Sequence, residues 1–182
     1  MLSRSPIKFC RQCGHAVIYR LPDDGDLRER AVCPSCHTVH YENPLNVVGT
    51  LPVLGDRVLL CRRNIEPRLG KWTLPAGFLE LGETTAQGAA RETDEEAGAE
   101  FEMGELFSVM NVVGAGQVHL FYRATLLHDR FAPGPESQEA KLFSEAEVPW
   151  DDLAFRTVKE ALRLFFEDRQ QGAFKFHHVD IH

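Results

Sequence analysis

The chain has 182 residues, enough for one globular domain with a substantial core and a small appendage. Its composition, 43% hydrophobic and 26% charged, is that of a soluble protein, and no run approaches the roughly eighteen apolar residues of a membrane helix. The net charge of −7 argues against general nucleic-acid binding, which needs a basic surface, and we expect no membrane partner.

The N-terminal segment MLSRSPIKFC carries one arginine and one lysine with no apolar stretch behind them, which argues against a secretory signal. We therefore expect a cytoplasmic protein, with an organelle as the alternative. In a reducing compartment, cysteines are free thiols or metal ligands rather than disulfides.

Four of the five cysteines form two pairs, Cys10 and Cys13 in CRQCG, then Cys33 and Cys36 in CPSCH. Two residues separate the members of each pair and nineteen separate the pairs, which is the spacing of a tetrahedral four-thiolate zinc site. Four protein thiolates leave no open coordination position, so we expect Zn²⁺ to be structural. A redox dithiol pair and two disulfides are the alternatives. The fifth, Cys61, lies in the strand-like run RVLLCRR and is expected to be buried.

The chain divides into two predicted domains, a zinc ribbon at residues 1–43 and a larger domain at 44–182. Within the larger domain, residues 46–54 and 57–63 are β-rich runs, and Gly55-Asp56 between them is a hairpin signal. Two more strands are expected at 107–113 and 117–127, and a loop with two prolines at 131–137.

An acidic helix is predicted between the two pairs of strands. Thr84 and Gln87 form a capping box, and Gly98 is suited to ending the helix. Glu92, Glu95 and Glu96 stand three and four positions apart and share one face, where like charges cost a few tenths of a kcal/mol per pair. A solvated face, with Arg91 paired to Glu95, is one interpretation. The preceding glycine-punctuated loop brings a further carboxylate, Glu83, and therefore favours a site for hard divalent cations.

Residues 150–170, WDDLAFRTVKEALRLFFEDRQ, carry apolar side chains at helical spacing. This pattern predicts an amphipathic helix that covers the sheet. The alternative is that its aromatic stripe forms a ligand groove.

Residues 77–99, GFLELGETTAQGAARETDEEAGA, resemble the signature of the Nudix hydrolases. Thr93 departs from that signature, because the family usually has an aliphatic residue there. The resemblance implies an α/β fold, a mixed-sheet α/β/α sandwich, preceded here by the zinc ribbon. The matching positions are Gly77, Glu83, Arg91, Glu92, Glu95, Glu96 and Gly98.

The resemblance also implies roles for individual residues. Glu92, Glu95 and Glu96 are the expected ligands of Mg²⁺ or Mn²⁺, and Glu83 adds a metal contact or holds the loop. Arg91 is expected to orient the acids through ion pairs, and Gly77 to allow close backbone approach. The catalytic residues of this interpretation are Glu95, Arg91 and Glu136.

Glu136 is the expected acid from outside the helix. The run PESQEAKLF offers two acids, Glu136 and Glu139, and an odd separation sends them to opposite faces of an extended segment. In the NADH pyrophosphatase branch of the family, a metal-binding glutamate begins a similar run, and it matches Glu136.

The substrate is predicted from two weaker resemblances. The cysteine ribbon is similar to the NADH pyrophosphatase branch, whereas FAPGPESQEAKLF and the closing FKFHH are similar to FAD and ADP-ribose pyrophosphatases. We expect hydrolysis of FAD or ADP-ribose, with Trp72, Gly77 and Phe78 contacting the nucleotide. The alternatives are an NADH or cap-type pyrophosphatase, and a non-catalytic nucleotide sensor or nucleic-acid-binding protein. The sequence itself does not reveal the oligomeric state, and the resemblance makes a homodimer a possible partner, since dimers are common in the family.

Overall fold

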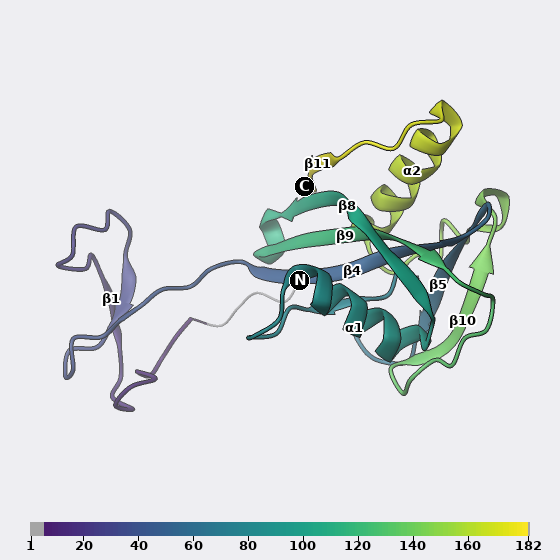
Figure 1. Cartoon of the computed structure of the whole chain (residues 1–182). Coiled ribbons are helices and arrows are strands. Elements are labelled where there is room, and N and C mark those ends of the chain that lie inside the picture. Colours follow the sequence, from purple (N-terminus) through teal and green to yellow (C-terminus); the bar gives the residue numbers. More distant parts are fainter. Residues whose placement is uncertain (1–5, 182) are drawn as a thin grey trace. The chain divides into compact units, whose positions relative to one another are not determined.

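The computed structural model describes residues 6–181, which fall into two compact units, with the boundary between Pro44 and Leu45 (Figure 1). The first unit is a small antiparallel sheet in the order β1-β2-β3 with two cysteine turns. Its strands are β1 (Ile18–Arg20), β2 (Arg30–Val32) and β3 (Val39–His40).

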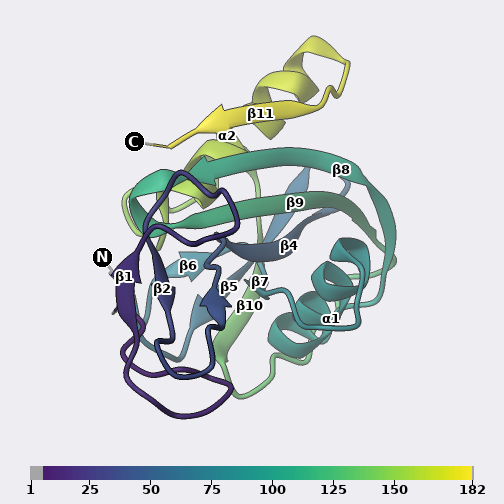
Figure 2. The ribbon, with the colours of Figure 1, turned by 90° about the vertical axis from the view of Figure 1, so that its left-hand side faces the viewer.

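Within the described part of the second unit, eight strands form one mixed sheet. Six of them follow the order β10-β5-β4-β9-β8-β11, while β6 pairs with β5 and β7 pairs with β4. β4 runs parallel to β9, and the last strand, β11, runs parallel to β8 at the edge of the sheet (Figure 2). The strands are β4 (Leu45–Leu54), β5 (Arg57–Arg63), β6 (Trp72–Thr73), β7 (Ala76–Phe78), β8 (Phe101–Val112), β9 (Gln117–Leu126), β10 (Ser137–Phe143) and β11 (His177–Asp180).

Two helices, α1 (Thr85–Ala97) and α2 (Arg156–Gln171), lie on opposite faces of this sheet (Figure 1). Because side chains alternate along a strand, each face has its own core. In β5, Leu60 packs into the large core that α2 covers with Phe165 and Phe166. The neighbouring Leu59 packs with Ala97 of α1 on the other face. The predicted mixed α/β sandwich is therefore confirmed.

The aromatic stripe of α2 is core, because Phe165 and Phe166 are each 2% exposed. The helix begins at Arg156, six residues later than the sequence predicts. Residues 150–155 instead run beside β6, where Asp152 and Ala154 exchange backbone hydrogen bonds with Trp72 at 3.0 and 2.8 Å. No helix within residues 6–181 is long and apolar enough to cross a membrane.

Candidate metal and phosphate site

α1 begins and ends where the sequence predicts. Thr84 Oγ1 accepts a hydrogen bond from the Gln87 amide at 3.2 Å, and Gln87 Oε1 accepts one from the Thr84 amide at 2.8 Å. At the other end, Gly98 adopts a left-handed conformation with φ 56°, and its amide donates to Asp94 O at 2.7 Å. These caps fix the helix that carries most of the acids.

Thr93 is buried against the sheet, where it finds polar partners. Its Oγ1 lies 2.7 Å from Oγ1 of Thr50 in β4 and 2.7 Å from the carbonyl of Ala89. Both threonines are fully buried. The departure from an aliphatic residue is therefore matched by a hydroxyl on the facing strand, which satisfies the buried donor and acceptor.

Arg91 is the centre of an ion-pair network. Its guanidinium binds both oxygens of Glu83 at 2.8 and 3.0 Å, and it contacts Glu92 at 2.7 Å and Glu95 at 3.0 Å. It also donates to the carbonyl of Phe78 at 3.1 Å. The hydrogen bonds that Glu83 accepts from Arg91 and from the Glu80 amide lower the pKa of Glu83 to about 2. One arginine thus joins the helix, the preceding loop and β7.

Glu96 is the most buried acid of the motif, at 5% exposure. Its Oε2 accepts a hydrogen bond from the Ala76 amide of β7 at 3.0 Å. Burial raises the pKa of Glu96 to about 7, although the Ala76 bond and the charge of Arg63 oppose the shift. The negative charges of Glu92 and Glu136 raise it further.

Glu92 packs directly against the backbone of β7. A Cβ at Gly77 would lie 2.4 Å from the carboxyl atoms of Glu92, so this position has room only for glycine while Glu92 stays in place. Burial raises the pKa of Glu92, and Arg91 opposes the shift, while Glu95 and Glu136 add to it. Glu95 differs from its neighbours because its side chain is 57% exposed.

Glu136 comes directly before β10, and its charge adds to the raised pKa of both Glu92 and Glu96. A β-bulge follows it, with Ser137 opposite Arg63 and Glu139 opposite Arg62. Arg63 shares a face of β5 with Leu59, which packs with α1, whereas Arg62 shares the other face with Leu60. The register therefore directs Glu139 away from the face that α1 covers.

The segment before Glu136 is held by Asn64, a residue that sequence reasoning missed. The Asn64 amide donates to Glu136 O at 2.8 Å, and its side-chain Nδ2 donates to Pro135 O at 2.9 Å. Nothing in the sequence identifies this pair, because 71 positions separate Asn64 from Pro135.

The predicted substrate-contacting residues have different environments. Phe78 is 50% exposed next to Gly77, and its carbonyl is bound by Arg91. Trp72 instead packs edge-on against Phe143, with ring centroids 4.9 Å apart, beside the large core.

The carboxylate set is chemically suited to magnesium or manganese. Hard divalent cations prefer carboxylate oxygens, and a bound cation would favour the charged forms of Glu92 and Glu96, whose pKa is raised by burial and, to a smaller extent, by the neighbouring acids. Within residues 6–181, only the cysteines already bring at least three donor atoms within 4.8 Å of one another. The carboxylates of Glu92 and Glu95 form ion pairs with Arg91.

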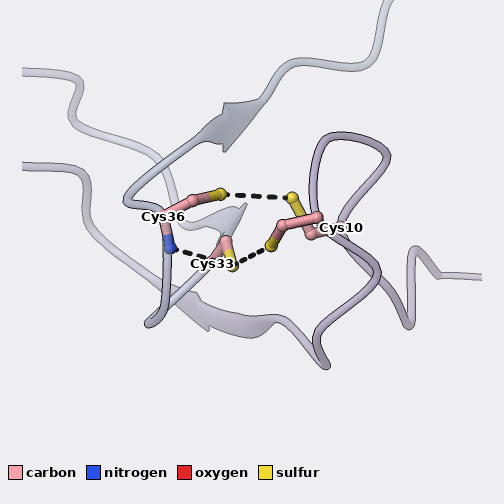
Figure 3. A group of neighbouring side chains, drawn as sticks. Cys10, Cys33 and Cys36 are labelled. Atoms are coloured by element: carbon pink, nitrogen blue, oxygen red, sulfur yellow. Dashed lines mark hydrogen bonds between the residues drawn. The ribbon is translucent and has the colours of Figure 1, made fainter.

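The four predicted zinc ligands converge in the first unit. Sγ of Cys10 lies 3.5 Å from Sγ of Cys36, and Sγ of Cys13 lies 3.4 Å from Sγ of Cys33 (Figure 3). A tetrahedral ion with Zn–S bonds of about 2.3 Å has sulfur atoms roughly 3.8 Å apart. The distances exceed a disulfide bond of about 2.05 Å, and the contacts join cysteines of different pairs. The thiols therefore fit zinc.

The two cysteine turns share one backbone pattern. The amides of Gly14 and His37 donate to the carbonyls of Cys10 and Cys33 at 2.9 and 3.0 Å. Gly14 and His37 both have positive φ, at 77° and 61°. This left-handed turn directs both sulfurs of a pair to the same side, although His37 adopts it without being glycine.

Comparisons with known proteins cover both units. Residues 44–167 match the family model described as NUDIX domain, and residues 8–42 match the model described as Nudix N-terminal. The chain is similar to a NUDIX hydrolase from Nitrosomonas europaea whose crystal structure is known. The two sequences are 49% identical, the structures superpose with a TM-score of 0.89, and the match covers 96% of this chain and 100% of that chain.

Curated relatives are longer proteins. The human NAD(P)H pyrophosphatase NUDT13, mitochondrial, is 37% identical over 153 residues, which are 81% of this chain and 40% of that protein. The NAD-capped RNA hydrolase NudC of Stutzerimonas stutzeri (strain A1501) is 29% identical over 146 residues, which are 78% of this chain and 50% of that protein. The chain thus spans half or less of the length of these two relatives.

Proposed function

Since this chain belongs to the Nudix family, we propose that it hydrolyses the pyrophosphate bond of nucleoside diphosphate derivatives and releases two monophosphates. The observation that carries this proposal is the cluster of acids joined by Arg91, with the half-buried Glu92 and the buried Glu96 near Glu136. A non-catalytic sensor has no need of this complete set of carboxylates.

The acids have separate roles in this proposal. Glu92, Glu95 and Glu96, with Glu83 and Glu136, would hold Mg²⁺ or Mn²⁺. When bound, such an ion neutralises charge on the diphosphate and lowers the pKa of water. Glu96 is held by the Ala76 amide, and Glu92 by Arg91 and the close backbone of Gly77.

The exposed acids, Glu95 and Glu136, are suited to proton transfer. A water oxygen forms a bond to one phosphorus, the bridging P–O bond breaks, and the water proton passes to a carboxylate. Arg91 keeps Glu95 at the helix surface through its 3.0 Å contact. Arg91 therefore acts by orienting acids rather than by taking up a proton, because an arginine stays protonated.

The substrate follows from two lines of argument. The resemblance of residues 131–143 and of the tail to FAD and ADP-ribose pyrophosphatases favours those two compounds. The second candidate is NADH or an NAD-capped RNA, and it is favoured by the names of two relatives, NUDT13 and NudC. All four compounds contain an adenosine diphosphate linked to another group, and the half-exposed Phe78 is the aromatic residue that would contact the nucleotide.

A substrate screen tests the proposal. The zinc-loaded chain with Mg²⁺ or Mn²⁺ is incubated with FAD, ADP-ribose, NADH, an NAD-capped RNA, diadenosine polyphosphates and nucleoside triphosphates, and products are identified by chromatography. We expect two monophosphates, one of them AMP in the case of FAD, ADP-ribose and NADH, with the fastest turnover for FAD or ADP-ribose. Equal or faster turnover of NADH at matched concentration would move the assignment to the second candidate. No turnover of any compound would contradict the function.

The acid outside α1 is tested by comparing Glu136→Gln with Glu139→Gln. We expect the first variant to lose at least about tenfold in kcat, because it removes a proposed metal-binding carboxylate whose charge acts on Glu92 and Glu96. Glu139→Gln is the matched control, one β-bulge away on the opposite face, and should stay near the wild-type rate. A larger loss in Glu139→Gln would reverse the assignment.

A further inference from the structure

We propose that Asn64 is the positioning residue that holds Glu136 at the metal site, an inference that rests on the proposed function. Glu136 is exposed, and within residues 6–181 its carboxylate forms no hydrogen bond or ion pair. Its position therefore depends on its backbone. An exposed segment that must be ordered before it can bind an ion loses affinity through conformational entropy.

Asn64 binds two consecutive carbonyl groups of that segment. Its amide donates to Glu136 O at 2.8 Å and its Nδ2 donates to Pro135 O at 2.9 Å. Because the two carbonyls lie on either side of the Glu136 Cα, the pair fixes the direction of the Glu136 side chain. The Ser137 amide closes the turn by donating to Gly134 O at 3.1 Å.

The opposite end of the segment is anchored on α1. The Ala132 amide donates to the carbonyl of Ala97 at 2.9 Å. A Cβ on Gly134 would lie 2.1 Å from the carbonyl of Glu95, so the segment touches the helix backbone there. The segment is thus held by the acidic helix at one end and by Asn64 at the other, which brings Glu136 toward the acids of α1.

Asn64 is also linked to the site through the residue before it in the chain, Arg63. It directly follows Arg63, the last residue of β5, whose charge opposes the raised pKa of Glu96. The Arg63 side chain is itself held by the carbonyl of Pro67 at 2.8 Å. A rigid strand end therefore carries Asn64, and the loop with Glu136 takes its position from that strand.

The test is Mn²⁺ binding to the zinc-loaded full chain, measured by the electron paramagnetic resonance signal of free Mn²⁺. Asn64→Ala removes the bond to Pro135 O and keeps the backbone bond. We expect Mn²⁺ affinity to fall roughly threefold, the size of one exposed hydrogen bond, with the melting temperature of the metal-free protein unchanged. Turnover at subsaturating Mn²⁺ should fall by the same factor and recover at high Mn²⁺.

Gln138→Ala is the matched control, because it removes a 3.5 Å contact to the Asn64 side-chain oxygen and leaves the Pro135 bond intact. The decisive comparison is a double-mutant cycle with Glu136→Gln. If Asn64 acts through Glu136, Asn64→Ala has no further effect on Mn²⁺ affinity in the Glu136→Gln background.

Equal losses in both backgrounds, or unchanged Mn²⁺ affinity in Asn64→Ala, would overturn the inference. A wild-type chain that binds no Mn²⁺ beyond the zinc site would overturn it together with the metal assignment. Mn²⁺ affinity that depends on Asn64 in a chain that hydrolyses no nucleotide would contradict the proposed function alone.

Discussion

Glu96 is a residue at which burial of a charge works against stability. Its pKa is raised from 4.5 to about 7 by burial, so the folded chain prefers the neutral form more than the unfolded chain does. The stability that this neutral form contributes is complete below pH 4.5 and is lost as the pH rises through 7. Without added divalent ions, we expect the free energy of unfolding to fall across this range by on the order of 3 kcal/mol. Urea denaturation at a series of pH values measures it.

Replacing Glu96 by glutamine allows its effect on stability and its effect on activity to be measured separately. Glu96→Gln keeps a side-chain oxygen that can accept from the Ala76 amide, and it removes the charge. We expect the pH dependence to flatten, the metal-free melting temperature at pH 7 to stay level or rise, and most turnover to disappear. A variant with the wild-type rate at saturating Mg²⁺ would show that Glu96 is not a metal ligand.

At the scale of elements, a pair of hydroxyls joins α1 to the sheet. Thr93→Val leaves the fully buried Thr50 hydroxyl without its partner, which costs about 1–3 kcal/mol. Thr50→Val leaves Thr93 its bond to Ala89 O and should cost less. The double variant removes both hydroxyls and should recover most of the stability lost in Thr93→Val.

Chemical denaturation of the three variants gives the coupling energy. Simple additivity of the two single effects would mean that the hydroxyls do not act as a pair. Turnover provides a second measurement, because a helix that shifts against β4 moves Glu92 and Glu96 away from β7.

The elements that are predicted best from the sequence are those marked by short capping or turn motifs. Thr84 and Gln87 mark the start of α1 and Gly98 marks its end, and Gly55-Asp56 defines a hairpin in which Leu54 pairs with Arg57. β8 starts at Phe101 rather than 107, and β11 was not predicted at all. β11 is a short strand whose place comes from parallel pairing with β8, and that pairing leaves no periodic pattern in its own four residues.

The candidate site also has residues that the sequence predicts and residues that only the structure identifies. The acids of α1 and Arg91 stand in one motif, so the sequence could name them and predict that Arg91 orients the acids through ion pairs. The dominant partner, Glu83, accepts from Nε and Nη2 of Arg91 with both carboxylate oxygens, and this pairing depends on the fold of the loop between the two residues. Asn64 directly follows β5 and the Ala76 amide belongs to β7, so only the tertiary structure brings Asn64 to Glu136 and the amide to Glu96.

At the scale of the whole molecule, we expect the loss of zinc to affect the two units differently. Cys10→Ser or Cys33→Ser removes a thiolate from the zinc site, so we expect loss of zinc and loosening of residues 7–41. Residues 45–182 have their own sheet and cores and should keep their thermal transition. Turnover should fall only indirectly, because the four thiolates leave no open position on the metal.

Zinc content by atomic absorption and turnover on the same samples check this prediction. Cys61→Ser serves as the control, because Cys61 is buried in the larger unit, apart from the four thiols. A reduced, folded wild-type protein without zinc would contradict the zinc assignment. The cytoplasmic location and the homodimer stay predictions.

The shared backbone pattern of the two cysteine turns has a consequence for how the ion is captured. Each turn closes within a few residues through its own backbone hydrogen bonds, so it can form before any metal arrives and then act as a bidentate chelator. Only the nineteen-residue loop between the pairs must close over a long range, and its entropic cost grows only slowly with length. Zinc uptake should therefore be sequential: one turn loads first, and its ion then works as a cross-link that recruits the other turn and restricts the unfolded chain much as a disulfide would.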